Sequence, residues 1–342
     1  MRTLEIPREG RTPSRIHIGE GLAARFAEYV PANSSLWVIT DSDVAVQYAD
    51  LLTPYNIIVL GRGEKDKTLQ TVEKIHLRLM EEGADRNSYI VGFGGGITTD
   101  VAGFVASTYM RGVGFGFVAT SLLAQVDASV GGKNGVNLGG YKNMVGVFNQ
   151  PDFVLCDVDV LDTLSGREFR AGLAEVVKSA VIDDAVLFEM LEGVSAEQLL
   201  ADKPLLEEVV WRTVNVKARI VAQDEREGGV RRLLNLGHTI AHAIEKSTRG
   251  YVHGEAVAVG MATINRVAKS LGVLSEECAE RIDALLDGLG LPTTCDVPNE
   301  VLSQALRKDK KGAGKSIHIV LPCRIGQCCV QTMTFEEFDA LL

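Results

Sequence analysis

A short apolar run that ends in three consecutive glycines restricts the possible folds of this chain more than any other segment. The letters SYIVGFG over 88–94 are typical of a buried β-strand, and Gly95 and Gly96 follow directly. The next segment, ITTDVAGFVAS, is rich in small and apolar residues. Because glycine permits close approach of the backbone, a strand that enters a helix through this turn can offer amide groups to a pyrophosphate. A tight turn without any ligand explains the glycines equally well.

Two further runs of β-forming residues come before the glycines. The letters LWVIT over 36–40 and NIIVLG over 56–61 read as buried parallel strands, and DSD after the first run reads as a turn. Apolar residues recur at helical spacing from Thr68 to Glu82, and Gly83 is placed to end that helix. Strands that alternate with helices predict an open α/β layer with a mostly parallel, Rossmann-like sheet, in which ligands bind beyond the carboxyl ends of the strands.

Helical periodicity dominates the chain after about Leu155. Segments such as REFRAGLAEVVKSAVI and GEAVAVGMATINRVAKSLG carry apolar residues at i, i+3 and i+4. Near the end, SIHIVLP and CCVQTM predict a small hairpin, and TFEEFDALL predicts a last short helix. A chain of 342 residues is long enough for two domains. We therefore expect a nucleotide-binding α/β domain over residues 1–157 and a predominantly α-helical domain over 158–342.

The composition excludes several classes of partner. Lys and Arg total 35 against 45 Asp and Glu, so the formal charge of −10 gives no overall attraction to nucleic acid or to an anionic membrane. An anionic ligand therefore needs a local basic site. No apolar run is long enough to span a membrane, and the N-terminus lacks the apolar core of a signal peptide. The six cysteines show no CxxC spacing, so we expect reduced thiols in a cytoplasmic protein.

Histidines are concentrated in one part of the sequence. Three of the six, His238, His242 and His253, fall within 16 residues. The first two share a helix face, and His253 opens the following segment, as a metal ligand from a second element would. Glu175 lies in a largely apolar helix one turn before Lys178, which fits either a metal ligand or a buried Glu–Lys pair.

Two imidazoles and one carboxylate form the ligand set of a catalytic Zn²⁺ site, which polarises a hydroxyl or carbonyl group. The chain has no HExxH motif, so the commonest zinc hydrolase is excluded, and the glycine turn favours redox chemistry with a nucleotide. Upstream, Glu64 and Lys67 follow a strand where ribose and phosphate contacts would lie. Their positions and spacing alone favour a solvated loop.

The longest motif of the chain is ATSLLAQVDASVGGKNGVNLGGYKNMVGVFNQP over Ala119–Pro151. It is preceded by GGGITTDVAGFVASTYMRG and followed in order by GLAEVVK, REGGVRRLLNLGHTIAHAIE and HGEAVAVGM. In these motifs, over about residues 36–325, the chain closely resembles the 3-dehydroquinate synthases of the sugar-phosphate cyclase superfamily.

This resemblance implies a homodimeric lyase that uses NAD and Zn²⁺, with Co²⁺ as a possible substitute. The implied reaction converts 3-deoxy-D-arabino-heptulosonate 7-phosphate to 3-dehydroquinate and phosphate in the shikimate pathway of aromatic amino acid biosynthesis. It proceeds by transient oxidation, β-elimination of phosphate, re-reduction and intramolecular aldol closure. The first domain then holds NAD, and the second holds the metal and the substrate.

The resemblance also implies residue roles. The metal ligands are Glu175, His238 and His253, and His242 is left to the substrate phosphate. The implied NAD contacts are Asp41, Glu64, Lys67, Gly95, Gly96, Asp100, Thr120, Ser121, Asp127, Lys133, Lys142, Thr163 and Glu168. The other implied catalytic and substrate-pocket residues are Asp127, Lys133, Lys142, Asn143, Lys178, Lys217, Arg231 and Asn235, with Arg111 reaching across the dimer to the phosphate and Lys315 as a further anion contact.

Three parts of the central motif depart from the family pattern. Ala119-Thr120-Ser121 replaces the usual Pro-Thr-Thr, Asn134 replaces a Thr, and Gly139-Gly140-Tyr141 replaces Pro-Leu-Gly. These departures affect loop geometry and remove no charged group that the mechanism needs.

Other functions remain open on sequence. The nearest is a sister cyclase of the 2-deoxy-scyllo-inosose or valiolone type, whose substrate lacks a carboxylate; Asp127, Lys133, Lys217 and Arg231 together favour an acid substrate. A second is a metal-dependent polyol dehydrogenase with a similar glycine turn, which would release NADH. A third is a nucleotide-binding pair of domains without catalysis, which the His–Glu set and the lysines disfavour.

Overall fold

A computed structural model describes residues 1–309 and 316–342 of the chain. Lys315 lies outside the described residues. The chain divides into two compact units, Met1–Leu164 and Ser165–Leu342, and each is described by itself. Among the described residues, no helix is both long enough and apolar enough to cross a membrane.

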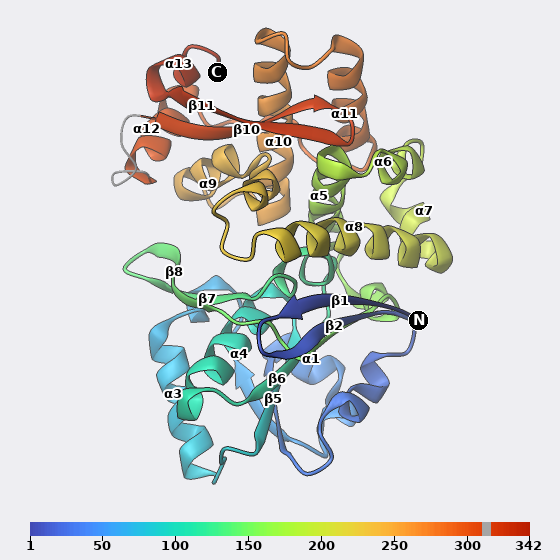
Figure 1. The fold of residues 1–342 in the computed structure, drawn as a ribbon, viewed down its shortest axis with the longest axis vertical. Helices are drawn as coiled ribbons and strands as arrows, with labels where there is room; N and C mark the ends of the chain where they lie inside the picture. Colours follow the sequence, from blue (N-terminus) through green and yellow to red (C-terminus); the bar gives the residue numbers. More distant parts are fainter. Residues whose placement is uncertain (310–315) are drawn as a thin grey trace. The chain divides into compact units, whose positions relative to one another are not determined.

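The first unit is built on a seven-stranded sheet with the strand order β1-β2-β9-β6-β5-β3-β4. Strands β1, β2, β5 and β6 of this sheet are labelled in Figure 1. Its strands are β1 (Arg2–Arg8), β2 (Arg11–Gly19), β3 (Ser35–Asp41), β4 (Asn56–Leu60), β5 (Ser88–Gly94), β6 (Gly114–Ala119) and β9 (Phe153–Asp157). Only the β1–β2 pair is antiparallel, and every other neighbouring pair is parallel. The expected mostly parallel sheet is therefore confirmed.

Helices and a separate hairpin complete this unit. The hairpin is β7 (Lys133–Leu138) with β8 (Tyr141–Phe148). The α-helices are α1 (Ser42–Gln47), α2 (Ala49–Leu52), α3 (Leu69–Glu81) and α4 (Gly96–Thr108). Short turns of helix are η1 (Ala23–Tyr29), η2 (Glu64–Asp66), η3 (Tyr109–Arg111), the π-helical η4 (Ala124–Ala128) and η5 (Asp159–Thr163).

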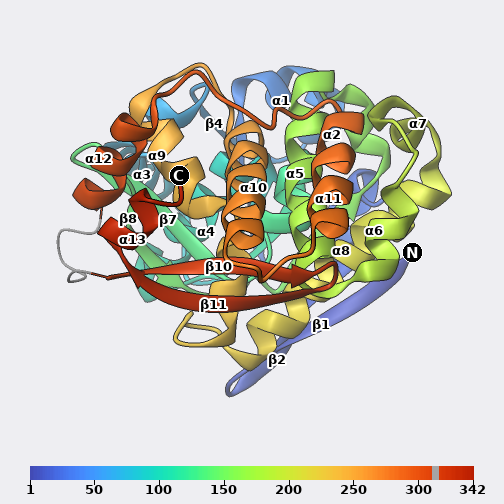
Figure 2. The same cartoon turned by 90° about the horizontal axis from the view of Figure 1, so that it is seen from above.

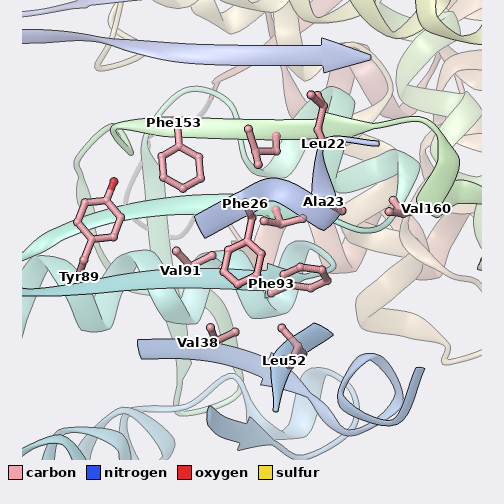
Figure 3. Packing of buried hydrophobic residues seen from close by; sticks show 12 residues of the cluster. Leu22, Ala23, Phe26, Val38, Leu52, Tyr89, Val91, Phe93, Phe153 and Val160 are labelled. Atoms are coloured by element: carbon pink, nitrogen blue, oxygen red, sulfur yellow. The ribbon is translucent and has the colours of Figure 1, made fainter. Parts of the chain in front are cut away.

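The core explains why β5 reads as an unbroken apolar run. All of its residues are buried, as expected for a central parallel strand that is covered on both faces. Val91 and Phe93 pack with Phe26 of η1, Val38 of β3 and Phe153 of β9 (Figure 3). The glycines that follow β5 are therefore held at the end of the most buried strand.

Two expectations from the sequence are wrong in detail. The run over 56–61 was expected to be a buried strand, but β4 is the edge strand of the sheet and Val59 is 49% exposed. The letters DSD were expected to form a turn, but α1 begins there. The Asp41 side chain accepts hydrogen bonds from the backbone N–H groups of Asp43 and Val44, and this N-cap satisfies amides that the helix leaves free.

The second unit is predominantly helical, as expected. Its helices are α5 (Gly166–Asp183), α6 (Ala185–Leu191), α7 (Ala196–Ala201), α8 (Lys203–Gln223), η6 (Val230–Asn235), α9 (His238–Ser247), α10 (His253–Ser270), α11 (Glu276–Gly288), α12 (Asn299–Asp309) and α13 (Phe335–Asp339). Strands β10 (Ser316–Arg324) and β11 (Gln327–Thr334) form the expected antiparallel hairpin.

Helix α10 packs against both α5 and α9 (Figure 2). Two glycines make this approach possible. A Cβ atom on Gly254 would lie 1.8 Å from the carbonyl oxygen of Ala171, and one on Gly260 would lie 2.1 Å from that of Gly237. Only glycine fits at such close backbone contacts. The starts of α9 and α10 are thereby held beside the middle of α5.

Candidate active site

Three potential metal ligands meet where α5, α9 and α10 converge. Glu175 lies within α5, and His238 and His253 are the first residues of α9 and α10. One ligand atom from each lies within 4.8 Å of the other two. The Nε2 atoms of His238 and His253 are 3.5 and 3.6 Å from Glu175 Oε1. Two imidazoles and one carboxylate at this spacing fit a catalytic divalent metal such as Zn²⁺.

The far side of each imidazole is held by an acceptor. His238 Nδ1 lies 3.1 Å from the Leu236 carbonyl oxygen, and His253 Nδ1 lies 3.2 Å from Glu245 Oε1 in α9. Such partners fix the tautomer and the direction of a ligating imidazole. Sequence reasoning did not identify Glu245. The signal that could have found it is its place seven residues after His238, on the same helix face.

The two interpretations of Glu175 from the sequence are compatible with one another. Glu175 and Lys178 are 1% and 2% exposed, and their side chains form an ion pair through Glu175 Oε2. The other oxygen, Oε1, faces the two histidines. The carboxylate is therefore both a member of a buried Glu–Lys pair and a member of the ligand set.

The local charges act on the two histidines in opposite ways. Burial, together with the positive charge of Lys178, lowers the pKa of His238 to about 3. Burial also disfavours the charged form of His253, but hydrogen bonds with Glu175 and Glu245 and their negative charges raise its pKa to about 10. An imidazolium carries one N–H on each ring nitrogen, so the protonated form of His253 can face Glu175 with Nε2 and Glu245 with Nδ1. A metal cation at Nε2 would replace the proton on that nitrogen.

His242 stands apart from the ligand set. It lies one turn after His238 in α9, and its exposed ring meets the His238 ring edge-on at a centroid distance of 5.7 Å. It does not belong to the group whose ligand atoms converge. The shared helix face of the two histidines therefore does not make both of them metal ligands.

The second unit also contains two buried cations and, before α9, a segment held by hydrogen bonds. Lys217 and Arg231 are 7% and 2% exposed. The Arg231 guanidinium donates to the Glu225 carbonyl oxygen, and Asn235 Nδ2 donates to Glu227 Oε1 at 2.5 Å. An ammonium and a guanidinium can each form charge-assisted hydrogen bonds with phosphate or carboxylate oxygens, so residues of these types are suited to an anionic ligand.

In the first unit, the start of α4 at the glycine turn has no side-chain cap. Gly95 is the N-cap of α4 and provides no side-chain cap. The Thr120 backbone N–H donates to the Gly94 carbonyl oxygen at 3.0 Å, and a Cβ atom on Gly95 would lie 3.5 Å from Ser121 Oγ. Uncapped amides at a helix N-terminus fit a pyrophosphate. Asp41 ends the neighbouring β3, and its Oδ2 accepts a hydrogen bond from Thr98 at 3.3 Å.

The interpretation of the segment with Glu64 and Lys67 as a solvated loop is wrong for Lys67. Its side chain is buried, and Nζ donates to Asp100 Oδ2 at 2.6 Å and to Asn143 Oδ1 at 2.5 Å. The hairpin β7–β8 and α4 supply these partners, which sequence spacing could not reveal. Burial raises the pKa of Asp100 to about 6, against the lowering effect of Lys67. Glu64 is exposed and accepts a hydrogen bond from Asn137.

The central motif forms η4 and the hairpin. Asp127 is half-buried in η4, whereas Lys133 and Lys142 are exposed in β7 and β8. Two departures from the family pattern have structural roles. Asn134 is buried, and its Nδ2 donates to the carbonyl oxygens of Gly132 and Asn149 at 3.2 and 2.8 Å. Gly139 and Gly140 form the two-residue hairpin loop with φ values of +59° and +82°, which favour glycine.

Three further implied residues lie in other elements of the chain: Arg111 in η3, Thr163 in η5 and Glu168 in α5. Arg111 follows the C-terminal end of α4, whose 13 residues span about 20 Å, so it lies far from the glycine turn of its own unit. Its side chain is exposed. Thr163 donates to the Val160 carbonyl oxygen at 2.6 Å in η5. Glu168 belongs to the second unit, in the first turn of α5.

Comparison with known proteins gives a consistent result. The family model described as 3-dehydroquinate synthase N-terminal matches residues 57–171, and the C-terminal one matches residues 172–312. A 3-dehydroquinate synthase of Lactococcus lactis subsp. cremoris is 45% identical over 348 residues, which cover 96% of this chain and 97% of that protein.

Solved structures of related cyclases share the fold. A 2-deoxy-scyllo-inosose synthase complexed with carbaglucose-6-phosphate, NAD⁺ and Co²⁺ aligns with a TM-score of 0.87 and 26% identity, covering 99% of each chain. The 2-epi-5-epi-valiolone synthase from Streptomyces hygroscopicus subsp. jinggangensis, with NAD⁺ and Zn²⁺ bound, has a TM-score of 0.86 and 27% identity, covering 99% of this chain and 97% of that one.

Proposed function

The chain belongs to the 3-dehydroquinate synthase family, and we propose that it converts 3-deoxy-D-arabino-heptulosonate 7-phosphate to 3-dehydroquinate and phosphate. The single observation that carries this proposal is the convergence of Glu175, His238 and His253, with Lys178 against the same carboxylate. The buried cations of this unit suit a substrate that bears both a phosphate and a carboxylate. A sister cyclase, whose substrate has no carboxylate, needs fewer of them.

We assign the metal to Glu175, His238 and His253. When bound, Zn²⁺ or Co²⁺ supplies a Lewis acid for the substrate hydroxyls, and NAD⁺ supplies a reversible hydride acceptor. Lys178 balances the charge of Glu175, and Glu245 keeps Nε2 of His253 directed at the ligand set.

The polar residues of the second unit orient the anionic groups of the substrate. Lys217 and Arg231 are buried cations that neutralise charge in a water-poor environment. Asn235 adds a neutral donor, and exposed His242 lies outside the ligand set, so it suits the phosphate. For the first unit, we propose that Asp127, Lys133, Lys142 and Asn143 also act on the substrate, as the family resemblance implies.

The first unit supplies the nucleotide contacts. The amides of Gly95 and Gly96 at the start of α4 bind the pyrophosphate, and Thr120 and Ser121 line the same turn. The carboxylates of Asp41 and Glu64 accept hydrogen bonds from ribose hydroxyls. The remaining proposed NAD contacts of this unit are Lys67, Asp100, Asp127, Lys133, Lys142 and Thr163, and the second unit adds Glu168.

We further infer a cytoplasmic homodimer. All six cysteines are free thiols, which suits a reducing compartment. Exposed Arg111 lies at the opposite end of α4 from the glycine turn, which suits a contribution to the phosphate site of a second copy.

One assay tests the proposed function. Purified protein is incubated with NAD⁺, Zn²⁺ and the heptulosonate phosphate, and phosphate release is followed together with absorbance of NADH. We expect phosphate to appear while NADH absorbance stays flat after a small initial rise, because oxidation and reduction occur at the same carbon. Steady accumulation of NADH would indicate a polyol dehydrogenase instead. Turnover of a sugar phosphate without a carboxylate, in preference to the acid, would indicate a sister cyclase.

A further inference from the structure

Asn137, in strand β7, makes hydrogen bonds in two directions. Its Nδ2 atom donates to Glu64 Oε1 at 2.7 Å, and its Oδ1 atom accepts from the backbone N–H of Asn143 at 2.9 Å. One side-chain amide therefore connects the η2 segment with strand β8. Neither sequence patterns nor the family resemblance gave this residue a role.

The main chain of Asn137 reinforces the connection. Its backbone N–H donates to the Lys67 carbonyl oxygen at 2.8 Å, and residues Thr68 and Asn137 form a parallel bridge. The hairpin β7–β8 is thus attached to residues 64–68 through both backbone and side chain. Lys67 adds a further link, because its Nζ contacts Asn143 Oδ1.

Asn143 has a backbone conformation that depends on these partners. Its φ is +52°, in the left-handed region that non-glycine residues adopt infrequently and that Asn tolerates best. The pairing of β7 with β8 shifts register between Val136 and Leu138, opposite this residue. Its N–H is directed to Asn137 and its side-chain oxygen to Lys67. The direction of the Asn143 amide is therefore set by its neighbours.

We propose that Asn137 is a positioning residue that holds a cofactor contact, Glu64, and a substrate contact, Asn143, in one hydrogen-bonded frame. The inference rests on the proposed function, which assigns those two roles. An amide is required because Glu64 needs a donor and the Asn143 N–H needs an acceptor. The amide offers them on two separate atoms, Nδ2 for Glu64 and Oδ1 for Asn143. Asn137 touches neither ligand in this proposal and acts through the two residues that do.

Two substitutions distinguish the hydrogen bond to Glu64 from the hydrogen bond with Asn143. Asn137→Ala removes both hydrogen bonds. Asn137→Asp keeps an acceptor for the Asn143 N–H but places a second carboxylate against Glu64, where the donor is lost. Alanine should therefore impair both ligands, and aspartate should impair the nucleotide alone.

The experiment measures the dissociation constant of NAD⁺ by calorimetric titration and the KM of the heptulosonate phosphate at saturating NAD⁺. For Asn137→Ala we expect both constants to rise about tenfold, the effect of losing a hydrogen bond to or near a charged group. For Asn137→Asp we expect a rise of about tenfold or more for NAD⁺, with KM within about twofold of wild type. In a double variant, Glu64→Gln with Asn137→Asp, residue 64 becomes the donor and residue 137 the acceptor. This variant should bind NAD⁺ more tightly than Asn137→Asp alone.

Exposed Asn33, in the same unit, provides the matched control, since Asn33→Asp adds the same charge away from the hairpin. The proposal is overturned if Asn137→Asp leaves the NAD⁺ constant unchanged, or if it raises KM as much as alanine does. The aspartate variant preserves the shape of the side chain, so it answers the question even if Asn137→Ala fails to fold. A wild-type protein that binds NAD⁺ but releases no phosphate would overturn the proposed function, and the titration would still decide whether Asn137 supports Glu64.

Discussion

Nδ1 of His253 lies 3.2 Å from Oε1 of Glu245, so the carboxylate of α9 holds the imidazole that begins α10. His238 has no such dependence on a side chain, because its Nδ1 atom faces the Leu236 carbonyl oxygen. Substitution of Glu245 can therefore remove the hydrogen-bond partner of His253, while His238 keeps its backbone partner.

We predict that Glu245→Gln lowers the affinity for Zn²⁺ by about 10- to 100-fold, the usual cost of losing a partner of a ligating histidine. Competition with a chromophoric chelator measures this affinity without any need for turnover. Glu255→Gln is the matched control, since Glu255 lies in α10 but pairs with Arg167. Equal zinc affinity of wild type and Glu245→Gln would show that His253 needs no carboxylate partner.

The histidines of α9 should separate by function. We expect His238→Ala, His253→Ala and Glu175→Gln each to lose zinc and activity, because a site with three protein ligands rarely tolerates the loss of one. His242→Ala should retain zinc and instead raise the KM of the phosphate substrate. Elemental analysis of the purified variants and steady-state kinetics decide this. Wild-type zinc content in two of the first three variants would contradict the ligand assignment.

Zinc uptake should release a proton. The hydrogen bonds and charges of Glu175 and Glu245 raise the pKa of His253 to about 10 despite its burial, so the metal-free protein holds this histidine protonated near neutral pH. A metal binds only neutral imidazole, so binding should displace about one proton, and affinity should increase as the pH rises toward that pKa. Calorimetry in buffers of different ionisation enthalpy counts the protons. A count near zero would mean that His253 is already neutral.

Subunit mixing tests the role of Arg111. Arg111→Ala should raise the KM of the phosphate substrate about tenfold or more, the value of one charge-assisted phosphate contact. In a mixed dimer with Glu175→Gln, one site combines an intact ligand set with an intact Arg111 from the other copy. Activity should then reappear in mixtures of two impaired proteins. No recovery, with exchange of subunits confirmed by mass spectrometry, would mean that Arg111 acts within its own chain.

Local patterns in the sequence were sufficient to predict most elements of the fold and the types of group in the site. Strand β5, the helix over 69–81 and the β10–β11 hairpin are correctly predicted, because apolar periodicity and glycine stops are local signals. The long central motif is also a local signal, and it identified the family. The concentration of histidines likewise indicated a metal site.

Which of these groups meet depends on the tertiary structure. Gly254 lets the backbone of α10 contact Ala171 of α5, and this packing brings His253 and Glu175 together. The burial of Lys67 and the two-sided bonding of Asn137 arise in the same way, because their partners lie on elements distant in the chain. Periodicity records which face of an element is apolar. It carries no information on which distant backbone that face will approach, since that depends on packing among several elements at once.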